Sequence, residues 1–135
     1  MAHFDRKRKF VSGADRSSDL GKLHFERALS PLVLERFARF MLEHNAPKGR
    51  REDQWQLGFP MESWVDSGYR HYHAWWKLHR GWDAFDEKGQ PIDIEEALCG
   101  LLFNVQGYLH QLLEAKQRRA NERRDKKTSK AHRNK

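Results

Sequence analysis

Apolar residues recur at helical spacing in three stretches, and residues typical of helix ends bound each of them. The first helix is predicted over 31–44, because Ser30 is a good N-cap and Pro31 suits the first helical position. The second is predicted over 62–80, with Gly81 where a C-terminal glycine belongs, and its aromatic residues are expected in the core. The apolar positions of these two helices are Val33, Leu34, Phe37, Ala38, Phe40, Met41, Val65, Tyr69, Tyr72, Trp75, Trp76 and Leu78.

The third helix is predicted from Asp93, an N-cap followed by acidic residues in the first turn. Its apolar stripe runs from Ile94 to Leu112. Beyond Ala115 the apolar period ends, and the helix either continues as an exposed basic extension or frays. Residues 21–25 are compatible with extended structure, but no alternating strand pattern of useful length is present. We therefore predict an all-α fold, a small bundle of three main helices.

Charge divides the 135 residues into three parts, although the formal net charge is +7. Residues 116–135 hold 10 Lys and Arg against 2 Asp and Glu, a charge of +8, and residues 1–11 hold 4 against 1, or +3. The intervening 12–115 hold 12 against 16, or −4. We therefore predict a flexible basic arm (1–19), a mildly acidic helical domain (20–115) and a basic C-terminal tail (the last 20 residues).

Composition excludes several classes of protein. No apolar run approaches the roughly 20 residues that span a bilayer, so no transmembrane helix is predicted. The basic start is not followed by an apolar stretch and is not expected to be a signal peptide. Cys99 is the single cysteine, which excludes a disulfide framework and favours the reducing cytoplasm.

Three carboxylates are candidate metal ligands. Asp93 and Glu96 share a helix face, and two carboxylates on one face suit a hard cation such as Mg²⁺. Acidic residues at a helix N-terminus also serve as simple caps. Glu35 on the first helix either supplies a third carboxylate from a facing helix or pairs with Arg39 one turn away.

The segment 70–76, Arg-His-Tyr-His-Ala-Trp-Trp, concentrates reactive side chains on the second helix. His71 and His73 lie about 200° apart around a helix, so they cannot bind one metal together and one is expected to face inward. An inward histidine is either a hydrogen-bonded core residue or a ligand. Arg70 is a candidate phosphate donor, because its guanidinium matches phosphate oxygens.

Short motifs follow one another in a defined order between Gly21 and Leu113. They are Gly21-Lys22-Leu23, Leu34-Glu35, Gln54-Trp55 with Gly58 and Pro60, Arg70-His71, Trp75 or Trp76, Gly81, and Glu96-Ala97-Leu98-Cys99 before Leu101-Leu102-Phe103. In this order they resemble the N-terminal-type domain of phage dATP/dGTP diphosphohydrolases, a small all-α family similar to the MazG-like nucleotide pyrophosphohydrolases. The resemblance implies divalent-metal hydrolysis of deoxynucleoside triphosphates to monophosphate and pyrophosphate.

The chain also departs from the family pattern. The family shows His-x-x-His-Ala where this chain has Asp93 and Glu96, an acidic residue in place of Trp82, and Asn in place of Gln54. Carboxylates in place of histidines suit Mg²⁺ or Mn²⁺ better than a softer ion. The departures are equally compatible with a site that has been rebuilt or lost.

The leading hypothesis is a Mg²⁺- or Mn²⁺-dependent pyrophosphohydrolase of dATP- or dGTP-like nucleotides, whose metal lowers the pKa of an attacking water and whose cations neutralise the phosphates. The residues assigned to it are Glu35, Asp93 and Glu96 for the metal, Glu35, His71 and Glu96 for catalysis, and Lys22, Trp55 and Arg70 for the substrate, with Asp86 or Glu87 assisting.

Two other hypotheses stay open. A small nucleic-acid-binding or phage accessory protein would use residues 116–135 for phosphate contacts without sequence specificity, because the tail has no reading motif. The same tail could simply be solubilising and disordered. An inactive family member would act as an oligomeric interaction module, since three helices leave an apolar face for a twofold partner, and a homo-oligomer is expected.

Overall fold

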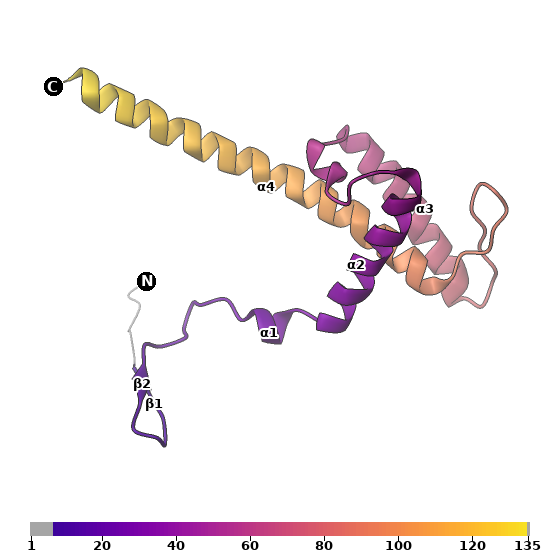
Figure 1. The fold of residues 1–135 in the computed structure, drawn as a ribbon, viewed down its shortest axis with the longest axis horizontal. Helices are drawn as coiled ribbons and strands as arrows, with labels where there is room; N and C mark the ends of the chain where they lie inside the picture. The colour runs from indigo at the N-terminus through magenta and orange to yellow at the C-terminus, as the bar shows by residue number, and fades with distance from the viewer. Residues whose placement is uncertain (1–6, 135) are drawn as a thin grey trace. The chain divides into compact units, whose positions relative to one another are not determined.

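The computed structural model describes residues 7–134, so the first six residues of the predicted arm and the last residue of the tail lie outside it. The described chain is mostly helical, as predicted (Figure 1). It separates into two compact units, one ending at Leu34 and one beginning at Glu35. Within residues 7–134, no helix combines the length and the apolarity needed to cross a bilayer.

The first unit contains a hairpin that the sequence analysis did not predict. Strands β1 (Arg8–Lys9) and β2 (Asp15–Arg16) pair antiparallel, and Gly13 has a φ of +90° in the turn between them. Further along, the segment 21–25, which the sequence left compatible with extended structure, leads into a single helical turn, α1 (Phe25–Ala28).

Helix α2 (Pro31–Asn45) confirms the first predicted helix. Ser30 caps it, because its Oγ accepts a hydrogen bond from the Val33 backbone N–H at 3.3 Å. At the other end, the Asn45 side chain donates to the Met41 carbonyl at 2.7 Å. Two short 3₁₀ turns follow, η1 (Ala46–Lys48) and η2 (Gln54–Leu57).

Helix α3 (Met61–His79) confirms the second prediction and ends as its glycine indicated. Gly81 has a φ of +81°, its N–H donates to the Leu78 carbonyl at 3.0 Å, and the Trp82 N–H donates to the Lys77 carbonyl at 2.9 Å. These two bonds form a Schellman motif, which satisfies the last carbonyls of the helix.

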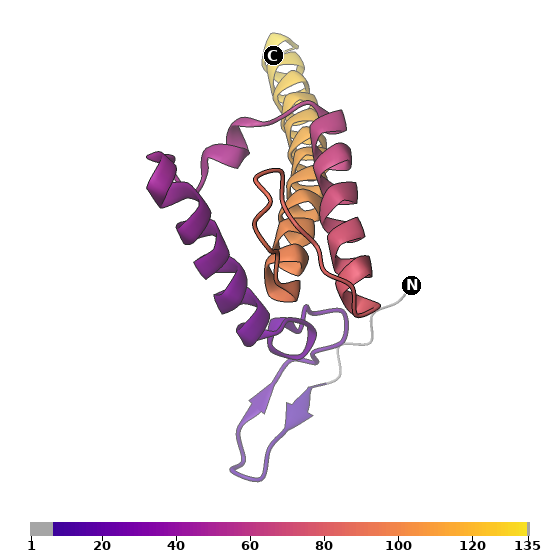
Figure 2. The same ribbon diagram turned by 90° about the vertical axis from the view of Figure 1, so that its right-hand side faces the viewer.

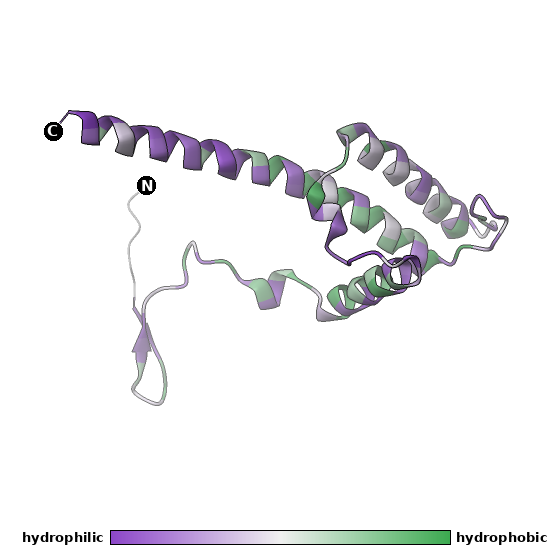
Figure 3. Cartoon of the chain, turned by 45° about the horizontal axis from the view of Figure 1, so that its top comes forward, coloured by the Kyte–Doolittle hydropathy of each residue, from purple (hydrophilic) through white to green (hydrophobic). Residues whose placement is uncertain are grey.

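Helix α4 (Ile94–Arg133) is a single helix of 40 residues, so the basic part continues the helix rather than fraying. Asp93 caps it, because its Oδ1 accepts from the Glu96 N–H at 2.9 Å. Hydropathy divides α4 into an apolar N-terminal half and a hydrophilic C-terminal half (Figure 3).

Helices α3 and α4 run antiparallel and side by side (Figure 2). Small residues of α4 allow the close approach. A Cβ on Gly107 would overlap the indole of Trp64, and one on Gly100 would overlap the imidazole of His71. Between them, the buried Asn104 amide donates to Ser67 Oγ at 3.1 Å and to the Gly100 carbonyl at 2.8 Å.

A second face of α4 packs against α2 and η2. The buried cluster consists of Phe37, Phe40, Met41 and Cys99, with Trp55, Leu102 and Phe103 packed around it. An ion pair between Arg36 Nε and Glu95 Oε1, 2.9 Å apart, also joins α2 to the first turn of α4.

The core holds fewer of the predicted apolar residues than expected, and α3 shows this most clearly. Trp75 and Leu78 of α3 pack with Ala74, Ala84 and Ala97, as expected. The other apolar residues predicted to line this helix lie at its surface instead: Val65, Tyr69, Tyr72 and Trp76 are exposed. The reason is that α3 meets α4 through the face that carries Trp64, Ser67 and His71, so the residues on its outer face are left uncovered.

Candidate functional site

A cleft of about 520 Å³ lies between α3 and the segment 80–93 that connects α3 to α4. Its charged side chains come from both elements. Arg70, His71 and Lys77 lie on α3, and Asp86 and Glu87 lie on the connection. Arg70 and His71 were assigned to the predicted site. They therefore share a cleft with Asp86 and Glu87, the two acids that the sequence analysis named as assisting. The remaining lining residues are Ser67, Tyr69, His73, Ala74, Ala84, Phe85 and Ile92.

His71 is a half-buried titratable group of this cleft. Its imidazole is half-buried against Gly100 of α4. Burial lowers its pKa and the charge of Arg70 lowers it further, while Glu87 opposes the shift. The imidazole is therefore uncharged at neutral pH and able to accept a proton. His73 is exposed, which gives the one inward and one outward histidine that the helical spacing predicted.

Hydrogen bonds fix the connection that carries the two acids. Asp86 Oδ1 accepts from the backbone N–H groups of Lys88 and Gln90, at 2.9 and 2.8 Å. The Ile92 N–H donates to the Ala84 carbonyl at 2.9 Å and closes the loop. Only one Asp86 oxygen takes part in these two bonds, so its other oxygen and the Glu87 carboxylate supply negative charge to the cleft.

The three predicted metal ligands are not brought together. Glu35 pairs with Arg39 on α2, with 3.5 Å between Oε1 and Nη2, and Asp93 caps α4. Glu96 lies exposed in the first turn of α4. Within residues 7–134, no three His, Cys, Asp or Glu side chains are arranged to hold a metal ion. Glu35 and Asp93 thus take the alternative interactions, an exposed ion pair and a cap.

Of the other two predicted substrate contacts, Trp55 does not line the cleft, and Lys22 belongs to the first unit rather than to the unit that holds the cleft. Lys22 is exposed in the first unit, and its backbone N–H donates to the Asp19 carbonyl at 3.0 Å. Trp55 on η2 is half-buried against the α2–α4 cluster, and its ring meets the His110 ring edge-on at a centroid distance of 4.8 Å. Trp55 therefore anchors η2 to α4.

No family model, no curated protein and no solved structure matches this chain. Its function is accordingly inferred from its own side chains.

The C-terminal half of α4 is the second functional candidate. Between Lys116 and Arg133 it carries 9 Lys and Arg against 2 Asp and Glu, a charge of +7. Nearly all of these residues are exposed. Arg118 pairs with Glu114 at 3.3 Å, and Arg124 donates to Asn121 at 3.2 Å. The helix thus presents basic side chains around much of its circumference.

Sequence reasoning missed Lys77 as a member of the cleft. Its signal was present, because Lys77 follows Arg70 by seven residues, or about two helical turns, and residues at that spacing share a helix face. The role of Asn104 and Gln111 in joining α3 to α4 had no comparable signal, since an isolated amide in an apolar helix is equally compatible with solvent exposure.

Proposed function

We propose that the cleft between α3 and residues 80–93 binds a deoxynucleoside triphosphate and hydrolyses it to the monophosphate and pyrophosphate. The observation that carries this proposal is the convergence of Arg70, His71 and Lys77 with Asp86 and Glu87 in one cleft. Cationic groups next to phosphate oxygens stabilise the charge that develops as the bond to phosphorus breaks. The order of motifs along the chain supports the same reaction.

The acids of the cleft fit a divalent cation. Mg²⁺ is commonly held by one or two protein carboxylates, while water and substrate phosphates complete its coordination. Glu87 and the second oxygen of Asp86 would hold the ion, in place of Glu35, Asp93 and Glu96. A bound ion would polarise the phosphates and lower the pKa of water.

The residues of the chain have distinct tasks in this proposal. Arg70 and Lys77 bind the phosphates, and the uncharged imidazole of His71 accepts the proton of the attacking water. The burial that keeps His71 uncharged also holds the ring in place against Gly100.

The test is pyrophosphate release by the full chain from a panel of dNTPs with Mg²⁺ or Mn²⁺. We expect Arg70→Gln, Glu87→Gln and His71→Gln each to lower the rate at least tenfold. Glu122→Gln, a carboxylate change in the basic half of α4, is the matched control and should leave the rate unchanged. No release by the wild type, or equal rates in the wild type and Arg70→Gln, would overturn the proposal.

A second function is favoured by a separate observation, the exposed basic half of α4. In this proposal the helix from Lys116 to Arg133 contacts the phosphate backbone of nucleic acid. Such binding is independent of sequence and weakens steeply with salt, because phosphate contacts release counterions.

Salt-titrated binding to duplex DNA and to RNA tests this second function. Replacing Arg123, Arg124, Lys126 and Lys127 by Gln should lower affinity and reduce the salt slope by up to about 4 on DNA, at roughly 0.9 for each phosphate that the helix no longer neutralises. The control replaces Arg50 and Arg51 by Gln and should bind as the wild type does. An unchanged slope in the α4 variant would contradict the proposal.

A further inference from the structure

The face of the α3–α4 pair that neither α2 nor η2 covers carries two rows of apolar residues. The α4 row consists of Ile94, Leu98, Leu101, Val105, Tyr108 and Leu112. The α3 row consists of Val65, Tyr69, Tyr72 and Trp76. We call these the outer rows. Successive members of each row are separated alternately by four and three residues.

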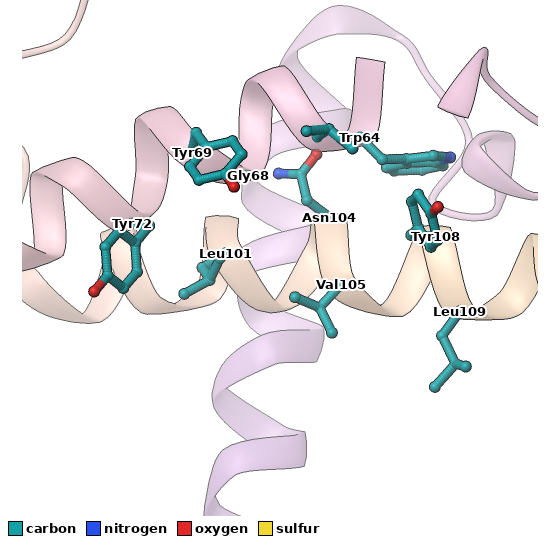
Figure 4. Close-up of a pocket in the computed structure, with 10 residues that line it drawn as sticks. Trp64, Gly68, Tyr69, Tyr72, Leu101, Asn104, Val105, Tyr108 and Leu109 are labelled. Carbon is teal, nitrogen blue, oxygen red and sulfur yellow. The ribbon is translucent and has the colours of Figure 1, made fainter. Parts of the chain in front are cut away.

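The central residues of the outer rows line a groove of about 550 Å³ (Figure 4). Tyr69 and Tyr72 border it from α3, and Leu101, Val105 and Tyr108 border it from α4. Several of these side chains are far more accessible than core residues: Tyr69 is 70% exposed, Val105 54% and Leu112 43%. A continuous exposed apolar surface of this kind marks an interaction site.

The spacing identifies the secondary structure of the occupant. An apolar repeat of 3.5 residues is the pattern by which helices pack in coiled coils and four-helix bundles. Two such rows on neighbouring antiparallel helices present the surface of half a four-helix bundle. The complementary half is therefore another pair of helices.

The outer rows also fix the length of the occupant. The α4 row begins at Ile94 and ends at Leu112, which is the part of α4 that lies beside α3. At the positions that would continue the row, α4 has Ala115 and then Arg119 and Glu122. The occupant is therefore as long as the α3–α4 hairpin itself.

The charges at the two ends of the α4 row favour one orientation of the helix that packs against it. Asp93, Glu95 and Glu96 make the N-terminal end of α4 acidic, and Lys116, Arg118 and Arg119 follow the C-terminal end of its apolar row. If two copies of α4 pair antiparallel, each basic segment lies beside the acidic end of the other copy. A parallel pair would instead bring together two basic halves of +7 each.

We propose that a second copy of this chain covers the outer rows, with the two α4 helices antiparallel and Val105 of each copy near the twofold axis. The interface is isologous, since the acidic end of each α4 meets the basic segment of the other. The remaining basic residues, from Arg123 onward, extend past the four-helix bundle at its two opposite ends. The argument for this assembly does not rest on the proposed hydrolysis, although Tyr69 lines both the groove and the cleft.

Sedimentation equilibrium of the full chain at micromolar concentration tests the assembly. We expect a dimer for the wild type, and at least a hundredfold weaker dimerisation for Val105→Glu. The matched control is Leu113→Glu on the same helix but outside the row, where Leu113 is 53% exposed. This control should remain dimeric, and circular dichroism should show equal helicity in all three proteins. A monomeric wild type would overturn the proposal; this would result if the first unit of the same chain covered the groove. Equal weakening of the dimer by both substitutions would overturn it as well.

Disulfide cross-linking tests the orientation, with the buried Cys99 replaced by Ala in every protein. If Val105 lies at the axis, Leu98 of one copy faces Leu112 of the other. A mixture of the Leu98→Cys and Leu112→Cys proteins should therefore cross-link, and neither should cross-link with itself. Cross-linking of Leu112→Cys with itself would show a parallel pair and overturn the antiparallel arrangement.

Discussion

The indole N–H of Trp64 on α3 donates a hydrogen bond to Oε1 of Gln111 on α4, 2.6 Å away. The same oxygen accepts from the Phe59 backbone N–H at 2.9 Å, and Gln111 Nε2 donates to the Phe59 carbonyl at 2.9 Å. One amide side chain thus satisfies both backbone groups of Phe59 and the buried indole. It joins the start of α3 to the middle of α4.

Gln111→Ala should lower the free energy of unfolding by about 1–3 kcal/mol, because it leaves the Trp64 N–H and two backbone groups without their partners. Urea denaturation followed by circular dichroism measures this loss. The matched control is Gln117→Ala, whose amide donates only along the helix surface to Asn121. A loss for Gln111→Ala no larger than the loss for Gln117→Ala would show that the link does not stabilise the fold.

Two of the glycines at the α3–α4 contact, Gly107 and Gly68, should respond oppositely to substitution by Ala. At Gly107 a Cβ would overlap the rigid indole of Trp64, and overpacking of this kind costs about 1–3 kcal/mol. At Gly68 a Cβ would meet the Asn104 Cβ at an ordinary 3.5 Å, and Ala in a helix interior gains roughly 0.5–1 kcal/mol over Gly. Melting temperatures should therefore fall for Gly107→Ala and rise for Gly68→Ala. A rise in both proteins would mean that the helices are not in close contact at Gly107.

His71 should make the protein less stable in acid. Its pKa in the folded chain is lowered from 6.5 by burial, so the unfolded chain binds the proton more readily. The contribution of the uncharged His71 to the free energy of unfolding is fully present above about pH 6.5. It is lost as the pH falls from there through the pKa of His71 in the folded chain. Melting temperature measured between pH 8 and pH 5 should fall less in His71→Gln than in the wild type. The exposed His73→Gln serves as control and should follow the wild type, so identical pH profiles of all three proteins would refute this role.

Asp93 should act through its hydrogen bond rather than its charge. Asp93→Ala removes the acceptor of the Glu96 N–H and should cost about 0.5–2 kcal/mol of stability. Asp93→Asn keeps the acceptor and should cost much less, because Asn is an equally good cap. Thermal unfolding in the presence of Mg²⁺ and of a chelator separates the cap from a metal ligand. A Mg²⁺-dependent stability that Asp93→Asn abolishes would restore Asp93 to the metal site.

Sequence reasoning predicted the helices well because their ends are chemically marked. Ser30, Gly81 and Asp93 make the capping contacts that their positions indicated. The same reasoning from sequence missed the β1–β2 hairpin, because two residues per strand are too few to show an alternating pattern.

Which faces meet could not be predicted in the same way. Apolar periodicity indicates that a stripe is covered, but it does not distinguish cover within the chain from cover by another molecule. Tyr69 and Val105 therefore resembled core residues, although the contact between α3 and α4 uses Gly100 and Gly107 instead. Of the candidate site, Arg70 and His71 were predictable from their types. Their meeting with Asp86 and Glu87 depends on the path of the connection between the helices.

Asn104 has a further consequence for the uniqueness of the fold. Among the described residues it is the one buried polar side chain. Its hydrogen bond to Ser67 exists only when Ser67 lies opposite it, whereas its bond to the Gly100 carbonyl stays within α4. Sliding α3 along α4 by one turn would break the bond to Ser67 and leave a buried N–H of the amide without its partner, at a cost of about 1–3 kcal/mol. Asn104 therefore acts together with the fit of Trp64 at Gly107 and of His71 at Gly100 to select a single alignment of the two helices.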